Sequence, residues 1–190
     1  MTASVAKTRP ASRTRSIAFC GLSIALMAVS AWVSIPFGPV PFTLQTFIMV
    51  FALLVLTPRE CLAAIGGYLL IGAVGLPVFS SMRGGIGVLA GPTGGFLWGF
   101  LIGAAMALVF LHFTKHFAEQ GAKKAFAINL GAALIFMVIT YLIGWAQLMV
   151  VAAMGPGAAF AAAIAPFIVI DIVKVAAAVG IASAVQKAIH

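Results

Sequence analysis

The stretch PFIVIDIVKVAAAVG, residues 166–180, carries an acid, Asp171, and a base, Lys174, in a run that holds no other charge. Residues three apart share one face of a helix, so the two side chains point the same way. A charged side chain at the centre of a bilayer costs about 2.5 to 3.5 kcal/mol, and such residues face a bundle interior or a watery cavity. The stretch therefore predicts a membrane helix with its charged face turned inward, as a structural ion pair or as part of a binding site.

The composition extends this interpretation to the whole chain. Of the 190 residues, 64% are hydrophobic and 7% are charged, whereas soluble domains carry about 25% charged residues. So few charges cannot cover a globular surface, and lipid must face much of it. We therefore expect an all-α integral membrane protein, and we interpret the net charge of +8 as a property of loops beside the bilayer, with no nucleic acid as partner.

Prolines, glycines and charges divide the chain into apolar ranges of helix length. A helix needs about 17 to 25 residues to cross, or fewer where protein shelters its end. We expect a basic cytoplasmic tail over residues 1–15 and one six-transmembrane-helix, substrate-binding domain over residues 16–190. A signal peptide is the alternative at the N-terminus, but the first apolar run exceeds its usual core of about 7 to 15 residues. The expected spans are Ser16–Ile35, Phe42–Thr57, Cys61–Leu76, Gly94–Phe113, Ala125–Gln147 and Pro166–Gln186.

The basic residues indicate the orientation of these spans. All of the 11 Lys and Arg residues except Arg83 and Lys174 lie before the first span, after the last, or in loops on that same side. Basic loops stay in the cytoplasm, so both termini are expected there, in a multi-pass protein of the bacterial cytoplasmic (inner) membrane. Glu60 and Glu119 lie beside these basic residues, and we interpret both as solvated loop charges.

Arg83, Asp171 and Lys174 are the ionisable residues that this topology leaves unexplained. Pro166 suits the first turn of a helix, which would place Asp171 about 8 Å and Lys174 about 12 Å below the outer end. Arg83 lies in the outer loop of residues 75–95, whose many glycines let backbone approach a ligand closely. The pair and the loop together predict a shallow pocket that opens to the outside.

Two further features belong to this outer region. Gln45, near the outer start of the second span, offers a donor and an acceptor in one amide, which suits a ligand that has both. Glycines at every fourth position, Gly91, Gly95, Gly99 and Gly103, predict that the fourth span packs closely on a neighbouring helix.

Four motifs, in this order and spacing, resemble the BioY family, the biotin-binding S component of energy-coupling factor (ECF) transporters. They are PVPFTLQTF (39–47), GLPVF (75–79), GPTGG (91–95) and PFIVIDIVK (166–174). The resemblance runs from about residue 16 to the end, and it implies a six-helix bundle that captures biotin at its outer face. The chain departs from many relatives at Phe96, where they have Tyr, and at Val169-Ile170, where they have Pro-Gly.

The resemblance suggests a role for each candidate. Asp171 would accept from the ureido N–H of biotin, Lys174 would donate to the ureido oxygen, and Arg83 would pair with the carboxylate. A rival assignment gives the carboxylate to Lys174 and leaves Arg83 at the rim. The motifs add further residues to the implied binding set: Phe42, Thr43, Gln45, Phe79, Gly91, Thr93 and Trp98. No cofactor or metal is implied.

In this family a transmembrane T subunit and two ATPase subunits energise the S component, which contacts them through small residues on the first helix. Here the corresponding stripe is Ala18, Gly21, Ala25 and Ala28, a narrow face suited to close helix contact. The alternative is that the stripe packs inside the bundle.

Other functions remain as alternatives. A self-sufficient secondary carrier for biotin or a related vitamin would use Asp171 as a proton-coupling site. An enzyme is not expected, because the sequence has no nucleophile with a base, no metal set and no ATPase motif. A purely structural membrane subunit would leave Arg83, Asp171 and Lys174 without a ligand.

Overall fold

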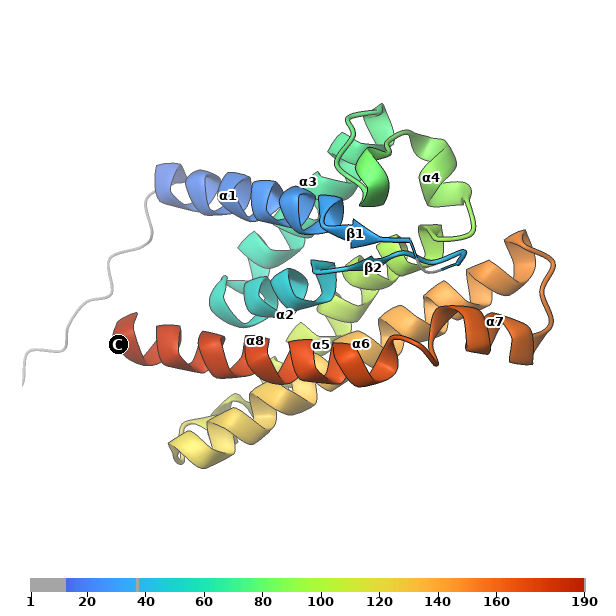
Figure 1. The fold of residues 1–190 in the computed structure, drawn as a ribbon. Coiled ribbons are helices and arrows are strands. Elements are labelled where there is room, and N and C mark those ends of the chain that lie inside the picture. The colour runs from blue at the N-terminus through green and yellow to red at the C-terminus, as the bar shows by residue number, and fades with distance from the viewer. Residues whose placement is uncertain (1–12, 37, 190) are drawn as a thin grey trace, which may run out of the picture.

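The computed structural model of the chain describes residues 13–36 and 38–189 (Figure 1). Residues 1–12, most of the predicted basic tail, lie outside the described residues. Within them the chain is a bundle of α-helices with one small hairpin. The elements are α1 (Arg13–Trp32), β1 (Ser34–Ile35), β2 (Phe42–Thr43), α2 (Gln45–Val55), α3 (Pro58–Val74), the 3-10 turn η1 (Ser80–Met82), α4 (Ile86–Ala90), α5 (Gly94–Ala118), α6 (Ala122–Val151), α7 (Pro156–Ala163) and α8 (Ile168–Ile189).

Helices overlap all six predicted spans, and their lengths differ widely. In the described residues, four helical ranges are long and apolar enough to cross a membrane alone: Arg13–Trp32, Gly94–Ala118, Ala122–Val151 and Ile168–Gln186. The α3 helix has 17 residues and α2 has 11. At 1.5 Å per residue α2 is about 16 Å long, roughly half the hydrocarbon core of a bilayer.

The first and second predicted spans are wrong at the ends that face each other. Ser34–Ile35 and Phe42–Thr43 are not helical but pair as an antiparallel hairpin, with Ser34 opposite Thr43. Pro36 explains the extended end of the first span, because a residue that precedes proline, here Ile35, favours an extended backbone, and Phe42–Thr43 pair with that strand. The hairpin places Phe42 and Thr43 at the end of the bundle where α1 ends, immediately before α2 (Figure 1).

The last span also begins later than the sequence predicted. Residues 148–165 are not a plain loop, because α6 continues to Val151 and α7 occupies Pro156–Ala163. A turn follows, in which the backbone N–H groups of Phe167 and Ile168 both donate to the Ile164 carbonyl at 3.0 Å. Pro166 lies inside this turn, so α8 starts two residues after it, at Ile168.

Glu60 is not the solvated loop charge that the sequence predicted. It lies in the first turn of α3, is only 8% exposed, and forms a capping box with Thr57. Its Oε2 accepts from the Thr57 backbone N–H at 3.1 Å and from the Thr57 hydroxyl at 2.8 Å. A capping box of this kind satisfies the exposed amides of a helix start, which explains why a carboxylate is held there.

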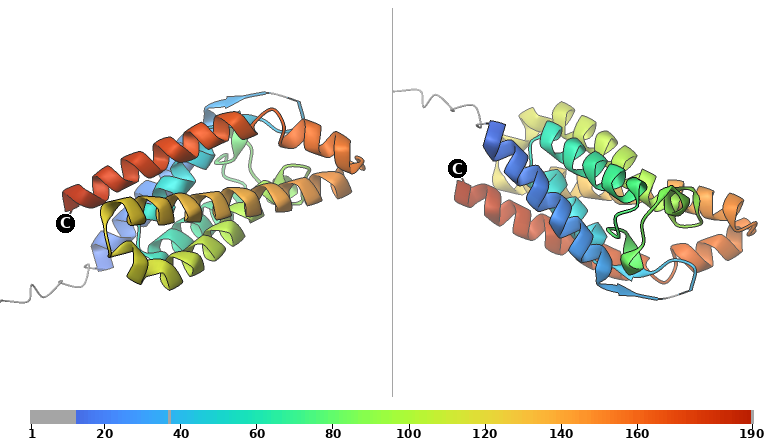
Figure 2. Two further views of the ribbon diagram at one scale, coloured as in Figure 1. Left: turned by 90° about the horizontal axis from the view of Figure 1, so that it is seen from below. Right: turned by 90° about the horizontal axis from the view of Figure 1, so that it is seen from above.

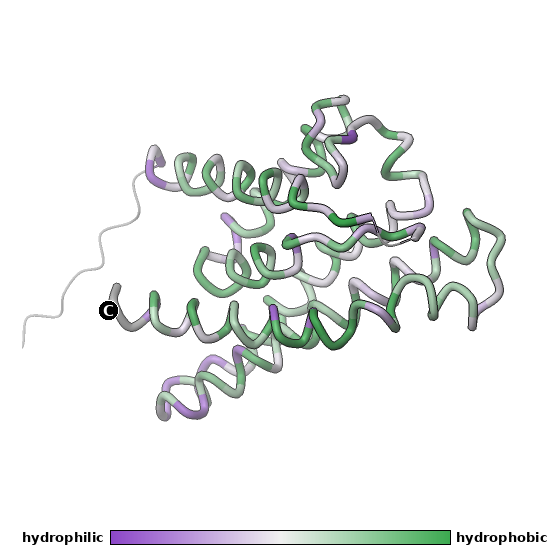
Figure 3. The backbone as a smooth tube through the Cα atoms, viewed as in Figure 1, coloured by the Kyte–Doolittle hydropathy of each residue, from purple (hydrophilic) through white to green (hydrophobic). Residues whose placement is uncertain are grey.

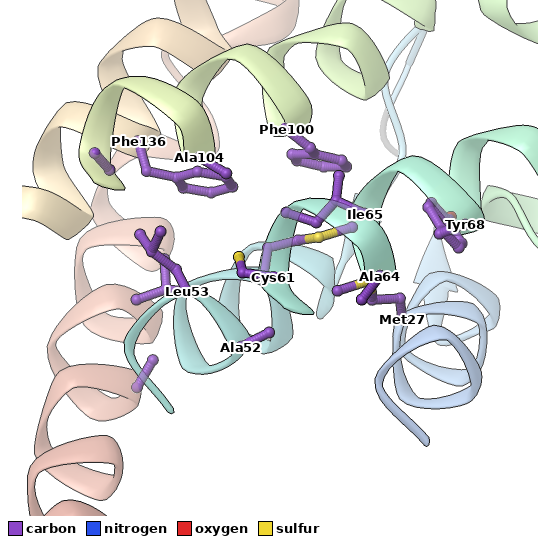
Figure 4. Close-up of a cluster of buried hydrophobic side chains, with 14 of the residues drawn as sticks. Met27, Ala52, Leu53, Cys61, Ala64, Ile65, Tyr68, Phe100, Ala104 and Phe136 are labelled. Carbon is purple, nitrogen blue, oxygen red and sulfur yellow. The ribbon is translucent and has the colours of Figure 1, made fainter. Parts of the chain in front are cut away.

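The helices pack in pairs around one apolar core. The α5 helix packs along α6, α2 on α8, and α1 on α3. Figure 4 shows the centre of the core, where Phe100 and Ala104 of α5 and Phe136 of α6 meet Cys61 and Ile65 of α3. This packing leaves the ends of the bundle to the loops and the hairpin.

Glycines allow the backbones of α5 and α6 to pack in close contact, as the glycines at every fourth position predicted. A Cβ atom at Gly95 would lie 2.5 Å from the Ile143 carbonyl oxygen, one at Gly99 2.7 Å from the Thr140 Cα, and one at Gly103 2.8 Å from the Phe136 carbonyl oxygen. Only glycine allows backbone to approach backbone this closely. Gly91 belongs instead to the loop that precedes α5.

The two ends of the bundle differ in character. The start of α1, the end of α8 and the turn between α5 and α6 lie at one end, and the hairpin, η1, α4 and α7 lie at the other (Figures 1 and 2). Hydrophilic residues are concentrated at the start of α1 and at the α5–α6 turn. The helices between the two ends consist mostly of hydrophobic residues (Figure 3).

Candidate functional site

A cavity of about 640 Å³, measured out to its open mouth, lies near the end of the bundle that carries the hairpin. Side chains from β2, α2, α5, α6 and α8 converge on it, and Ser80 of η1 reaches it from the loop above. Ligand pockets in proteins combine mostly apolar walls with a few polar groups. The lining residues are Val40, Pro41, Phe42, Thr43, Gln45, Thr46, Ser80, Thr93, Phe96, Leu97, Phe100, Thr140, Tyr141, Ala163, Phe167, Asp171 and Lys174.

The charged pair of α8 lines this cavity, as the sequence predicted. Asp171 is 6% exposed and Lys174 is 8% exposed, and the Lys174 Nζ lies 2.8 Å from the Asp171 Oδ1. The same ammonium donates to the Thr43 carbonyl at 2.6 Å and lies 3.7 Å from the centre of the Phe42 ring. Lys174 therefore joins α8 to the hairpin through both residues of β2.

Tyr141 is a member of this cluster that sequence reasoning missed. Its hydroxyl donates to the Asp171 Oδ2 at 2.6 Å, so both carboxylate oxygens of Asp171 are held by protein donors. The ammonium of Lys174 has three donors, and these are directed at Asp171, Thr43 and the Phe42 ring. The hydrogen-bonding capacity left at the pair is mainly the remaining lone pairs of Asp171, so the polar end of the cavity favours a ligand with N–H or O–H donors.

Gln45 and Thr43 form a second polar group on the cavity wall. The Thr43 hydroxyl donates to the Gln45 Oε1 and accepts from the Gln45 backbone N–H, both at 3.3 Å. Gln45 is 5% exposed and is the first residue of α2. Both residues were predicted from the sequence, and the structure places them beside Lys174, which bonds the carbonyl of Thr43.

The rest of the wall is aromatic. Phe42 stacks on Phe167, with ring centres 6.4 Å apart and ring planes 21° apart. Phe96 and Phe100, one turn apart on α5, also line the cavity. Of these rings only Phe42 was predicted. The ring of Phe96 carries no hydroxyl, so this part of the wall offers a ligand no side-chain hydrogen bond.

Four predicted residues do not line the cavity, namely Trp98, Phe79, Gly91 and Arg83. Trp98 is 41% exposed, because it follows the cavity-lining Phe96 and Leu97 onto the outer face of α5. Phe79 is fully buried elsewhere, edge-on to Tyr68 with ring centres 5.5 Å apart. Gly91 serves the loop, where its carbonyl accepts from the Gln147 side-chain amide at 2.8 Å. Thr93, from the same motif, does line the cavity.

Arg83 is exposed and lies at the rim rather than in the wall. Its Nε donates to the Ser80 carbonyl at 3.3 Å, and Ser80 is a lining residue. Arg83 is therefore hydrogen-bonded to a residue that lines the cavity but does not line the cavity itself. Its role toward a ligand stays a prediction.

The small-residue stripe of α1 is mostly exposed. Ala18, Gly21 and Ala25 are exposed, and a Cβ atom at Gly21 would meet nothing within 4 Å among the described residues. Ala28 is buried at 6% exposure. Internal packing therefore accounts for Ala28 and not for the other three residues.

Removing the Tyr141 hydroxyl is expected to weaken the site without emptying it. In a Tyr141→Phe variant the Asp171 carboxylate loses one of its two donors, and a hydrogen bond to a charged group contributes about 1.5 to 3 kcal/mol. We expect ligand affinity to fall about tenfold or more, with the helical content unchanged. Isothermal titration of both proteins measures this, and equal affinities would contradict a role for Tyr141.

Fold and site together define a class of protein. A bundle of long apolar helices that holds a mostly apolar, open cavity with a buried ion pair is a membrane protein built to bind a small molecule. Residues 2–190 match the BioY family, so the chain belongs to this family.

Curated relatives agree with this assignment. The chain is 36% identical to the biotin transporter BioY of Thermotoga maritima, over 91% of this chain and 96% of the relative. It is 37% identical to a probable biotin transporter BioY of Pyrococcus horikoshii, over 92% of this chain and 98% of the relative. These relatives are named as transporters, in accord with the expectation that the chain is not an enzyme.

A solved structure has the same fold. The S component for biotin from an ECF-type ABC transporter superposes with a TM-score of 0.81 and covers 92% of each chain, at 23% sequence identity. The likeness to this structure supports the expected S-component architecture and says nothing by itself of the ligand.

Proposed function

We propose that the protein captures biotin from the outer side of the membrane and serves as the substrate-specificity subunit of an ECF-type importer. The observation that carries the proposal is the acceptor-rich polar end of the cavity, formed by Asp171 and Gln45, beside the aromatic wall of Phe42, Phe96 and Phe167. Biotin has two ureido N–H donors, one carbonyl acceptor and an apolar thioether ring, which match these surfaces in kind. The membership of the chain in the BioY family also supports the proposal.

The charge balance of the pair favours the ureido ring as its partner. Asp171 and Lys174 together are neutral, and a neutral ureido group adds no charge to the buried end of the cavity. The rival assignment, with the biotin carboxylate on Lys174, would bury a net negative charge, which is costly at low dielectric. We therefore assign the ureido N–H to Asp171 and the ureido oxygen to Lys174, with the carboxylate directed to the mouth and Arg83.

The ureido oxygen can reach Lys174 if the Phe42 ring moves aside. The contact between the ammonium and this ring is the weakest of the three that Lys174 makes, since the other two are hydrogen bonds to oxygen at 2.6 and 2.8 Å. A cation–π contact contributes about 0.5 to 2 kcal/mol. If the ureido oxygen replaces the Phe42 ring as the third partner of Lys174, the ion pair of Lys174 with Asp171 is therefore kept.

We propose that the six helices α1, α2, α3, α5, α6 and α8 form the membrane domain, in the bacterial cytoplasmic (inner) membrane, with both termini cytoplasmic. The supporting observation is the position of the basic residues, because Arg13 and Arg15 begin α1 and Lys123 and Lys124 begin α6, at the same end of the bundle. Cationic residues at one end favour the cytoplasm there. The cavity then opens to the outside.

We propose that α1 docks on a transmembrane T subunit, which connects the protein to two ABC ATPase subunits. The exposed stripe of Ala18, Gly21 and Ala25 supports this proposal, because small residues allow close contact between membrane helices. The stripe lies on the helix that leads directly into the hairpin, and the second strand of this hairpin lines the cavity, so a short segment connects the docking face to the binding site.

The double substitution Gly21→Leu and Ala25→Leu is expected to weaken assembly with the T subunit and to leave biotin affinity unchanged. Co-purification with the partner subunits measures assembly, and titration measures binding. The matched control is Ala176→Leu with Gly180→Leu, also an exposed alanine and glycine four residues apart, on α8. Equal assembly of both double variants would contradict the docking face, and a loss of biotin binding would indicate internal packing.

Uptake of labelled biotin by cells tests the transport role. In an ECF-type importer ATP hydrolysis supplies the energy, so we expect uptake only when T and ATPase subunits are present, and loss of uptake when the ATPase cannot hydrolyse ATP. A secondary carrier that uses Asp171 would instead take up biotin alone and would stop when the proton gradient is collapsed. Absence of biotin uptake with all partners present would contradict the proposed function.

A further inference from the structure

A chain of buried hydrogen bonds links the cavity to the loop above it through Tyr68. The Gln45 Nε2 donates to the Tyr68 hydroxyl at 2.8 Å, and that hydroxyl donates to the Val78 carbonyl at 2.9 Å. Tyr68 is 0% exposed and Gln45 is 5% exposed. Gln45 lines the cavity, while Tyr68 is not among the lining residues, so Tyr68 acts on a ligand only through Gln45.

The direction of this chain is fixed by chemistry. A backbone carbonyl can only accept, and a phenol has one proton to give. The Tyr68 proton therefore goes to Val78, and the Tyr68 oxygen is left to accept from Gln45. The alternative, with Tyr68 donating to Gln45, would leave the Val78 carbonyl buried without a donor, which proteins avoid.

The second contact of the Gln45 amide agrees with this direction. Its Oε1 accepts from the Thr43 hydroxyl at 3.3 Å, so the nitrogen faces Tyr68 and the oxygen faces Thr43. A carbonyl oxygen has two lone pairs, and one remains available. An amide that was free to rotate by half a turn would offer the cavity a donor as readily as an acceptor.

We propose that Tyr68 is a positioning residue for specificity, which locks the Gln45 side-chain amide so that it presents its oxygen, an acceptor, to the ligand. The site would thereby select an N–H donor at this position and reject an isosteric acceptor. For the ligand identity the inference rests on the proposed function, since biotin supplies such donors in its ureido ring.

The chain of hydrogen bonds from Gln45 through Tyr68 to Val78, called the relay below, also explains why a large polar residue is buried in α3. Tyr68 lies in the apolar core (Figure 4), where phenylalanine would pack equally well against Phe79. The hydroxyl is held by partners from α2 and from residue 78, far apart in the sequence. A core tyrosine with both bonds satisfied orders the groups at its two ends.

A Tyr68→Phe variant tests the proposal with biotin and two analogues in which one or the other ureido N–H is replaced by a ring oxygen. A site that hydrogen-bonds a ligand N–H strongly rejects an analogue without it. We expect the wild-type protein to bind at least one of these carbamates far more weakly than biotin. In Tyr68→Phe, biotin affinity should fall about tenfold while that carbamate binds as well as before or better, because the amide can now turn its N–H inward.

A matched control is Trp145→Phe, which removes another aromatic donor to a backbone carbonyl, the Trp145 Nε1 bond at 3.1 Å to Pro156, the first residue of α7. Its ratio of biotin to carbamate affinity should equal that of the wild type. A change in Tyr68→Phe that weakens biotin and both carbamates by one common factor would overturn the proposal, and so would no change at all.

A double-mutant cycle on the ligand-free protein separates this inference from the proposed function. Gln45→Met, Tyr68→Phe and the double variant are compared by thermal unfolding, and the relay requires that the double variant lose less than the two single losses combined. Additive losses would overturn the relay. If the wild type bound no biotin, the proposed function would fail, together with the ligand preference inferred here, while the cycle would still report on the relay.

Discussion

A Lys174→Met variant is expected to bind biotin at least a hundredfold more weakly than the wild-type protein. Methionine has a similar length and no charge, so the substitution leaves Asp171 buried without its cation. Loss of one partner of a buried pair costs about 3 to 5 kcal/mol of folding stability. A lost hydrogen bond to a charged donor costs about 1.5 to 3 kcal/mol of binding free energy, and each 1.4 kcal/mol is a factor of ten in affinity. The ligand also loses the donor assigned to its ureido oxygen.

A second variant distinguishes a lost binding group from a damaged fold. Asp171→Asn combined with Lys174→Met removes both charges, so no unpaired ion remains in the bundle, and replacement of a buried pair by uncharged groups is often tolerated. We expect this double variant to recover most of the thermal stability and none of the biotin affinity. Biotin affinity within threefold of the wild type in either variant would refute the assigned role of the pair.

Gly99→Ala is expected to destabilise the bundle by about 2 to 3 kcal/mol, within the range for overpacking. The added methyl group would lie 2.7 Å from the Thr140 Cα and 3.0 Å from its carbonyl oxygen. Both atoms belong to the backbone of α6, which cannot turn aside as a side chain can. The variant must separate α5 from α6, and both helices line the cavity, so biotin affinity should fall as well.

The matched control for this variant is Gly180→Ala on α8, where a Cβ atom would meet nothing within 4 Å among the described residues. Alanine is favoured over glycine within a helix by about 1 kcal/mol, so Gly180→Ala should have an equal or higher Tm. Thermal unfolding in detergent compares the two variants. Equal Tm values for Gly99→Ala and Gly180→Ala would contradict the close packing of α5 on α6.

The sequence predicted the polar part of the site because charge is rare in this chain. Asp171 and Lys174 stand out in an apolar run, and their spacing placed them on one face of α8, where the structure has them. Gln45 stood out at the start of an apolar helix for the same reason. The repeat of glycines predicted the contact of α5 with a neighbour, although not that the neighbour is α6.

The aromatic part of the site could not be predicted with the same certainty, because the chain has 15 Phe residues and composition does not tell lining rings from core rings. Trp98 was chosen in place of Phe96, and a shift of two residues on a helix turns a side chain to the far face. Tyr141 gave no local signal, since its partner Asp171 is 30 residues away. The N–H preference at Gln45 depends on Tyr68 and Val78, which only the fold brings together.

Helix ends were least predictable where loops have structure of their own. The hairpin strand Phe42–Thr43 and the turn around Pro166 stand where helix was expected. Each contributes one aromatic ring to the cavity wall, and these two rings, Phe42 and Phe167, stack on each other. Hydropathy alone could not separate these short segments from the spans beside them. Thr57 and Glu60 carried a capping-box pattern, which marks the start of α3 and would have corrected its boundary.

Titration of the purified, ligand-free protein with biotin tests the central claim most directly, because the claim is that the buried pair and its cavity exist to hold this ligand. Related vitamins serve as competitors in the same experiment. The account predicts saturable binding of one biotin per chain that the other vitamins do not displace and that Lys174→Met weakens at least a hundredfold. Absence of saturable binding, or binding that Lys174→Met leaves unchanged, would contradict it.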